Sequence, residues 1–237
     1  MKLWAIGDLH LSFSEEGKLR KPMGIFGENW ENHDQKIKDN WIENISGDDL
    51  ILIPGDFSWA MNLEELKLDI EYLNKLPGKK IFIRGNHDYW WTSSKKMKEF
   101  FPEGIYFIQN DYFQIKEDLY ICGTRGWSVP GEKGFSQEDE KIYFRELSRL
   151  RLSLNSVPKG SNIEIIVMLH YPPVNMKHEY SGFIELLEEY NVKLCIYGHL
   201  HDASIGCRIP DSKWGIDFRL VSADALNFKP SLIKIIS

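Results

Sequence analysis

Seven residues with carboxylate, imidazole or amide side chains stand directly after short apolar segments of this 237-residue sequence. They are Asp8, His10, Asp56, Asn86, His170, His199 and His201. Oxygen and nitrogen ligands in this mixture suit divalent transition ions such as manganese, iron, zinc or cobalt. A further argument is that five of the seven histidines of the chain fall inside these short clusters. The sequence therefore predicts a metal centre that holds such ions as cofactors.

The apolar segments before these residues are typical of strands buried on both faces. They cover residues 3–6, 50–53, 80–83, 163–169 and 192–197. In open α/β sheets, ligands bind beyond the carboxyl ends of the strands, so we expect the five clusters to meet at one edge. Glycine precedes a functional residue at positions 7, 55, 85 and 198. We expect these glycines to let the backbone turn tightly without a Cβ clash.

Helical periodicity separates the predicted strands. Apolar residues at three- and four-residue spacing predict helices over 32–45, 63–76, 93–101, 137–154 and 183–190. Asn62 and Glu65 indicate an N-cap pair for the second of these. Alternating strands and helices favour an α/β fold with a largely parallel first sheet.

Later in the chain the pattern changes to short strands. Residues 105–108, 112–116 and 119–123 are predicted to form a meander, and 218–222 and 232–236 two more strands. So many strands favour two packed β-sheets flanked by helices, a four-layer α/β/β/α sandwich. The candidate residues run from 8 to 201, so we expect one domain over residues 1–237.

The composition of the chain indicates which classes of partner it is expected to bind. The formal net charge of −6 and the absence of a long Lys/Arg run make nucleic acid an unlikely partner. No apolar stretch approaches the ~20 residues of a membrane span, and the N-terminal apolar run is too short for a signal peptide, so a cytoplasmic location without membrane contact is expected. Three scattered cysteines give no disulfide framework. The sequence does not indicate the oligomeric state.

The polar clusters also carry a family resemblance. D-x-H at 8–10, G-D at 55–56, G-N-H-D at 85–88, a lone histidine at 170 and G-H-x-H at 198–201 follow one another in this order. Each fragment is weak alone, but five in order after predicted strands are specific. Together they resemble the calcineurin-like metallophosphoesterase superfamily, and within it the bacterial branch of small predicted phosphohydrolases. The resemblance covers about residues 3 to 201 and implies the same sandwich fold.

The resemblance also implies roles for individual residues. One ion would be held by Asp8, His10, Asp56 and His201, and the other by Asp56, Asn86, His170 and His199, with Asp56 bridging the two. His87 would not bind metal but would protonate the leaving oxygen. The implied function is a dinuclear metal-dependent phosphohydrolase that cleaves a small phosphomonoester or phosphodiester. Two ions roughly 3.5–4 Å apart would generate the hydroxide that attacks phosphorus.

Two other functions are compatible with the family resemblance but are disfavoured. A non-catalytic metal-binding scaffold of the same fold is disfavoured because no motif residue is missing. A nuclease of the same superfamily is disfavoured by the net negative charge. The Gly55-Asp56-Phe57 segment also lacks the Arg-Gly pair that the resemblance would require of a phosphoprotein phosphatase.

Two arginines are candidates for binding a substrate phosphate. Arg84 directly precedes the glycine of the G-N-H-D cluster, but it could equally pair with an acidic neighbour. Arg125 lies in a glycine-flanked loop, and there a structural role is favoured.

Aromatic residues and the remaining histidines leave alternatives open. Trp59, Trp90 and Trp91 lie close in sequence to proposed ligands and could stack on a nucleobase, although core packing is the commoner use of such rings. His33 and His178 lie outside every cluster and are expected to be solvated.

Overall fold

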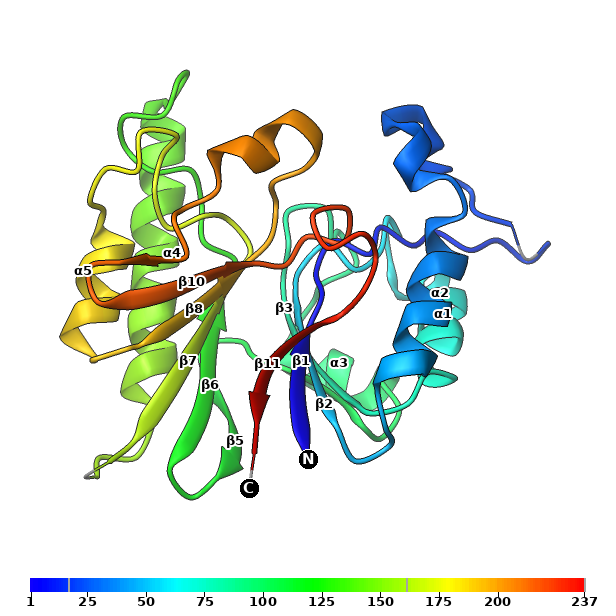
Figure 1. Ribbon diagram of the computed structural model, residues 1–237, viewed down its shortest axis with the longest axis horizontal. Coiled ribbons are helices and arrows are strands. Elements are labelled where there is room, and N and C mark those ends of the chain that lie inside the picture. Colours follow the sequence, from blue (N-terminus) through cyan, green and yellow to red (C-terminus); the bar gives the residue numbers. More distant parts are fainter. Residues whose placement is uncertain (17, 161, 237) are drawn as a thin grey trace.

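The chain forms two β-sheets packed face to face, with helices on the two outer faces (Figure 1). A computed structural model describes residues 1–16, 18–160 and 162–236. The first sheet has the order β11-β1-β2-β3-β4, in which β1 to β4 are parallel and β11 is an antiparallel edge. Its strands are β1 (Lys2–Ala5), β2 (Leu50–Pro54), β3 (Lys79–Ile83), β4 (Ile105–Phe107) and β11 (Ser231–Ile235).

The second sheet has the order β5-β6-β7-β8-β10-β9. Strands β6, β7, β8 and β10 run parallel, while β5 and β9 pair antiparallel at the two edges. The bounds are β5 (Tyr112–Lys116), β6 (Leu119–Thr124), β7 (Glu164–Leu169), β8 (Leu194–Tyr197), β9 (Ser212–Lys213) and β10 (Ile216–Leu220).

In the part of the chain that the structure describes, five α-helices cover the outer faces, three over the first sheet and two over the second (Figure 1). They are α1 (His33–Asn44), α2 (Leu63–Asn74), α3 (Ser94–Phe100), α4 (Gln137–Asn155) and α5 (Gly182–Glu189). The described residues also form three short 3₁₀ segments: η1 (Met23–Phe26) and η2 (Glu28–Trp30) between β1 and α1, and η3 (Asp202–Cys207) between β8 and β9. At the start of α2, Oδ1 of Asn62 accepts the backbone N–H of Glu65 at 3.0 Å, which is the predicted cap.

Three apolar layers hold the four structural layers together, and they explain why the strands are apolar at nearly every position. Alternate side chains of a strand point to opposite faces. In β1, Leu3 packs between the two sheets, whereas Trp4 packs under the helices of the first sheet. In β8, Ile196 lies between the sheets and Tyr197 under α4 and α5. The predicted four-layer α/β/β/α sandwich is confirmed.

The predicted meander is wrong. Strand β4 pairs parallel to β3 at the edge of the first sheet, and the chain then crosses to the second sheet, where β5 and β6 form a hairpin. The crossing occurs at Gln109–Asp111, where Asn110 adopts a positive φ of 66°. Short apolar runs in succession show that strands follow one another, but not which sheet each strand joins. Among the described residues, none of the helices has the length and apolar character required to cross a membrane.

Candidate metal centre

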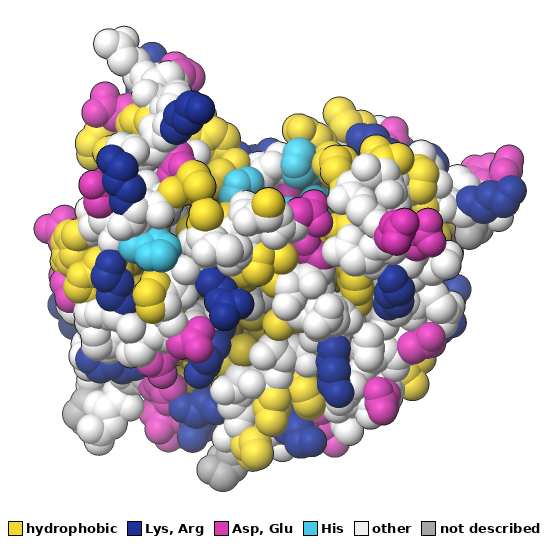
Figure 2. Space-filling view, turned by 45° about the horizontal axis from the view of Figure 1, so that its top comes forward, with side chains coloured by type: hydrophobic (Ala, Val, Ile, Leu, Met, Phe, Trp, Pro, Cys, Tyr) yellow, Lys and Arg dark blue, Asp and Glu magenta, His cyan; other side chains and the backbone are white. Residues whose placement is uncertain are grey.

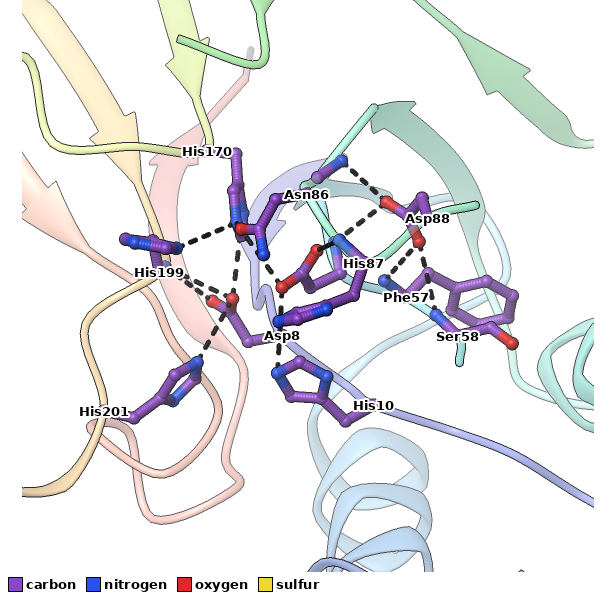
Figure 3. A network of polar contacts seen from close by, with 12 residues as sticks. Asp8, His10, Phe57, Ser58, Asn86, His87, Asp88, His170, His199 and His201 are labelled. Carbon is purple, nitrogen blue, oxygen red and sulfur yellow. Dashed lines mark hydrogen bonds and ion pairs between the residues drawn. The ribbon is translucent and has the colours of Figure 1, made fainter. Parts of the chain in front are cut away.

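The carboxyl ends of five central strands deliver the seven predicted ligands to one edge of the sandwich (Figure 3). Two ligands follow β1, one each follows β2, β3 and β7, and two follow β8. Figure 2 shows histidine side chains at the floor of a depression between two projections of this face. Segments 191 residues apart in the chain thus meet where the backbone N–H of His199 donates to the carboxylate of Asp8 at 3.2 Å.

Asp56 occupies the centre of this cluster. Its Oδ2 atom lies 3.9 Å from Nε2 of His10 on one side and 3.5 Å from Nε2 of His170 on the other. Its Oδ1 atom accepts the backbone N–H of His87 at 2.8 Å, which fixes the direction of the carboxylate. One oxygen atom of Asp56 therefore faces two groups of potential metal ligands.

The first group surrounds Asp8. The ligand atoms of Asp8, His10 and His201 lie within 4.8 Å of one another, and Nε2 of His201 lies 3.4 Å from Oδ1 of Asp8. Behind His201, Oδ1 of Asp224 lies 2.8 Å from Nδ1 of the ring. Asp224 thereby leaves Nε2 of His201 to face the cluster. A carboxylate behind a histidine in this way is the usual support of a histidine that binds metal.

The second group surrounds His170. The Nδ1 atom of this buried ring lies 3.0 Å from the carbonyl oxygen of Pro54, so Nδ1 carries the proton and Nε2 carries a lone pair. That Nε2 atom lies 2.6 Å from Oδ1 of Asn86 and 3.2 Å from Nδ1 of His199. Metal–ligand bonds of about 2.0–2.2 Å place neighbouring ligand atoms roughly 3.0–3.5 Å apart. The 3.2 Å between the nitrogen atoms of His170 and His199 fits two ligands of one divalent ion, and Asp8, Asp56 and His170 also place ligand atoms within 4.8 Å of one another.

Electrostatics supports the same conclusion. Asp8 and Asp56 are both buried and close to each other. Burial and the nearby charge of Asp8 raise the pKa of Asp56 to about 8. For Asp8, burial alone would raise the pKa, but the attraction of His201 overcomes this and lowers it. Two buried carboxylates of like charge need cations beside them, and divalent ions supply this charge.

The histidines carry pKa shifts that favour metal binding at most positions. Burial, followed by the neighbouring His170, lowers the pKa of His199 to about 3. Burial also lowers the pKa values of His10 and His170. These rings are neutral at physiological pH and offer a lone pair. His201 is different, because Asp8 and Asp224 outweigh burial and raise its pKa to about 10, so an ion must displace a proton there.

The backbone is strained at several of the proposed metal ligands. Positive φ values occur at Asp8 (57°), His10 (46°), Asp56 (50°) and His199 (71°). Non-glycine residues adopt this region at a cost, and such strain gathers at functional sites. Of the four glycines that precede functional residues, only Gly55 has a positive φ, of 90°.

The glycines at 85 and 198 serve another purpose. A Cβ atom at Gly85 would overlap the carboxylate of Asp56, and one at Gly198 would overlap that of Asp8. Both residues have ordinary backbone angles, so the absence of a side chain makes room for the neighbouring ligand. The expectation from the sequence that a Cβ atom would clash at these glycines is thus confirmed at Gly85 and Gly198.

Asp88, the last residue of the G-N-H-D cluster, holds the Asp56 loop in place. Its fully buried carboxylate accepts the backbone N–H groups of Gly85 (2.7 Å), Asp56 (2.9 Å) and Phe57 (3.0 Å), and the indole N–H of Trp90 (3.1 Å). One carboxylate thus ties the turn after β2 to the turn after β3. This is a structural role.

His87 lies beside the two groups. Its ring packs against the indole of Trp59, with centroids 4.2 Å apart, and lies 5.8 Å from the ring of His10. Burial, followed by repulsion from His170 and Lys21, lowers the pKa of His87 to about 4. The free ring is therefore neutral at pH 7, and the negative charge of a bound phosphoester would have to raise its pKa before the ring could donate a proton.

The tryptophans near the centre act as packing residues. Trp59 lies between His10 and His87, and Trp90 is buried against Phe57. The packing role favoured from the sequence therefore holds for both. His33 contradicts the expectation of a solvated side chain, because it is buried against Trp30.

Arg84 lies beside two other arginines and a glutamate. It lines a cavity of about 50 Å³ together with Arg125, Arg149 and Glu146. Glu146 pairs with Arg125 at 3.3 Å and with Arg149 at 2.7 Å. Substrate binding by Arg84 stays a prediction.

Two functional residues were missed from the sequence. Asp224 follows β10 and acts on His201 from 23 positions away, so no local motif marks it. Asp69 on α2 accepts the backbone N–H of Phe13 at 2.7 Å and the hydroxyl of Ser58, and so joins the segments that follow β1 and β2. For Asp69, the available signal in the sequence is a carboxylate at a buried position of a helix. Its hydrogen-bond partners are known only from the folded chain.

Comparison with known proteins agrees with this geometry. A family model described as calcineurin-like phosphoesterase matches residues 1–203. Among curated protein sequences, none gives a significant match. Solved structures with the same fold include a protein of unknown function from Aquifex aeolicus (20% identity, 98% of this chain and 95% of that chain covered, TM-score 0.52). They also include phosphopantetheinyl hydrolase from Mycobacterium tuberculosis (16% identity, 98% and 95% covered, TM-score 0.54).

Proposed function

Because this chain belongs to the calcineurin-like phosphoesterase family and is a metal-dependent hydrolase of phosphoester bonds, we propose that it acts through two metal ions bridged by Asp56. The observation that carries the proposal is the position of Asp56 Oδ2, which faces His10 at 3.9 Å and His170 at 3.5 Å. A single-ion site would need only one of these groups. The substrate would be a small phosphomonoester or phosphodiester.

The two ligand sets would be divided by this carboxylate. Asp8, His10 and His201 would hold one ion together with Asp56, and Asn86, His170 and His199 would hold the other. When bound, such ions supply an activated water nucleophile and offset negative charge on the phosphoryl oxygens. Manganese, iron, zinc and cobalt all suit the donor set.

The protein residues would position the reacting groups. Asp224 and the Pro54 carbonyl orient the rings of His201 and His170, and Asp88 fixes the loop that carries Asp56. His87 lies beside the cluster, with an unpaired and buried Nδ1 atom. We propose that this ring takes up a proton as the anionic substrate binds and delivers it to the departing alkoxide.

The two competing functions are less well supported. A non-catalytic metal-binding scaffold would need the ligands but not His87, which lies beside them and is not one of the proposed ligands. A nuclease would need a basic surface, whereas the chain has a net charge of −6. The cytoplasmic location stays a prediction.

The test is hydrolysis of p-nitrophenyl phosphate and bis(p-nitrophenyl) phosphate by protein stripped of metal and then reloaded with manganese, zinc, iron or cobalt. Activity should require metal and should be lost in Asp56→Asn, because the amide cannot bridge two cations as a carboxylate does. Asp217→Asn removes an exposed carboxylate on β10 and should leave activity unchanged. Hydrolysis that persists without metal, or that survives Asp56→Asn, would overturn the proposal.

A further inference from the structure

A pocket of about 200 Å³ opens directly beside the proposed metal centre. It lies between the loop after β6, the segment after β7 and the turn after β8. His199 is common to both features: it lines the pocket, and its Nδ1 atom lies 3.2 Å from Nε2 of His170. Tyr171, which also lines the pocket, packs its ring on that of His199 with centroids 4.0 Å apart. A group bound in this pocket would therefore touch a residue of the metal centre.

The wall of the pocket is mainly apolar. Val129, Pro172, Val174 and Leu200 contribute hydrocarbon surface, and Met176 is a further apolar lining residue. Met176 is 63% exposed, which leaves its flexible side chain free to pack on a ligand. Figure 2 shows hydrophobic side chains next to the histidines in the depression.

Several polar groups of the wall already have partners. The Nδ2 group of Asn175 donates to the carbonyl oxygen of Pro130 (3.1 Å) and to Glu179 (2.6 Å). Ser204 bonds to the backbone N–H and carbonyl groups of His201. Glu132 accepts the backbone N–H of Met176 at 3.2 Å, and its carboxylate disfavours a second anionic group in the pocket. The pocket thus offers apolar contact more than hydrogen bonds.

We propose that this pocket binds the organic group of the substrate, and that the group is an uncharged hydrocarbon chain or ring. The inference rests on the proposed function, which places the phosphoryl group beside His199. A cavity of about 150 Å³ is large enough to bind benzene. The pocket accordingly has room for one ring or a short alkyl chain, and it selects phosphoesters of apolar alcohols over those of sugars.

The test is direct binding of alkylphosphonates, from methyl to hexyl, to the manganese-loaded protein by calorimetry. These probes keep the charged head group constant while the apolar chain grows. Each methylene buried in an apolar site strengthens binding roughly fourfold. We expect the dissociation constant to fall by more than tenfold between ethyl- and hexylphosphonate. A dissociation constant that does not change with chain length would overturn the inference.

Substitutions in the pocket test whether the dependence of affinity on chain length arises there. Ser128→Phe fills the pocket and should abolish the dependence on chain length, and Met176→Ser should reduce the advantage of the hexyl compound severalfold. Met61→Ser is the matched control, because Met61 is a methionine of similar exposure (56%) outside the lining of this pocket. Equal slopes in the wild type, Met176→Ser and Met61→Ser would contradict the assignment.

The two proposals fail in different ways. If the loaded protein hydrolyses neither p-nitrophenyl substrate, the proposed function is wrong. If it hydrolyses them but binds methyl- and hexylphosphonate equally, only the apolar pocket is wrong. Hydrolysis of straight-chain alkyl phosphates, whose leaving groups differ little in basicity, should show the same rise in kcat/KM with chain length.

Discussion

Oδ1 of Asp224 lies 2.8 Å from Nδ1 of His201, and this contact leaves Nε2 of the ring facing Asp8 at 3.4 Å. The other carboxylate oxygen of Asp224 accepts the backbone N–H of Asp202 at 3.0 Å. Asp224 therefore fixes both the ring of His201 and the start of η3. It is a positioning residue that acts on the proposed metal centre through another side chain.

The first prediction concerns this contact. Asp224→Ala should weaken metal binding by about 10- to 100-fold, the usual effect of losing the support behind a metal-bound histidine. Metal titration monitored by calorimetry measures the change. Asp217→Asn on β10 should bind metal as the wild type does. Unchanged affinity in Asp224→Ala would show that Asp224 only packs against the turn.

The second prediction concerns Asp88. Asp88→Ala leaves the buried N–H groups of Gly85, Asp56 and Phe57 without their acceptor. Each unpaired buried donor costs roughly 1–3 kcal/mol, so we expect the free energy of unfolding to fall by about 3 kcal/mol or more. Urea denaturation of the metal-free protein measures this. A loss below about 1 kcal/mol would mean that water replaces the carboxylate.

The third prediction is a pH dependence set by Asp69. Burial raises the pKa of this carboxyl to about 6 from an ordinary value of 3.8. The folded protein thus keeps a proton that the unfolded chain releases, and the contribution of Asp69 to stability falls as pH rises from about 4 to 6. Above that range the contribution stays constant.

Asp69→Asn tests this sign, since the amide cannot ionise. The free energy of unfolding of Asp69→Asn relative to the wild type should increase between pH 4 and pH 6 and then level off, measured in urea on metal-free protein. A difference that does not vary over this interval would show that Asp69 has an ordinary pKa, and one that decreases would show that folding lowers its pKa.

The fourth prediction concerns His87. His87→Ala should keep its metal content, because His87 is not one of the proposed ligands. It should slow the hydrolysis of alkyl phosphates by about 10²- to 10⁴-fold, since their leaving groups need a proton. Hydrolysis of p-nitrophenyl phosphate should suffer much less, because p-nitrophenolate departs as an anion. Equal slowing of both substrates would argue against proton donation by His87.

Much of the fold follows from local pattern. Apolar spacing, a local signal, predicts a helix over 137–154, and α4 occupies Gln137–Asn155. The assignment of β4 and β5 to different sheets was missed, because pairing depends on distant strands. The rule that ligands bind beyond the carboxyl ends of the strands correctly predicted that Asp8, Asp56 and His170 lie together, because this rule depends on sheet topology alone.

The supporting residues of the site were harder to predict. Asp224 and Asp69 act across long sequence distances, and their partners depend on how segments pack after folding. The shift in the pKa of His87 to about 4 likewise arises from burial, which the sequence does not show. The positions of the proposed ligands can be predicted because they directly follow strands. The residues that orient these ligands can be identified only from the tertiary structure.

The central claim is that Asp56 joins two ion sites, and metal content tests it most directly. Elemental analysis of protein loaded with manganese and freed of excess metal should give two ions per chain in the wild type. Asp56→Ala, which removes the oxygen that faces both His10 and His170, should lower this value toward zero. One ion per chain in the folded wild type, or two retained in Asp56→Ala, would contradict the account.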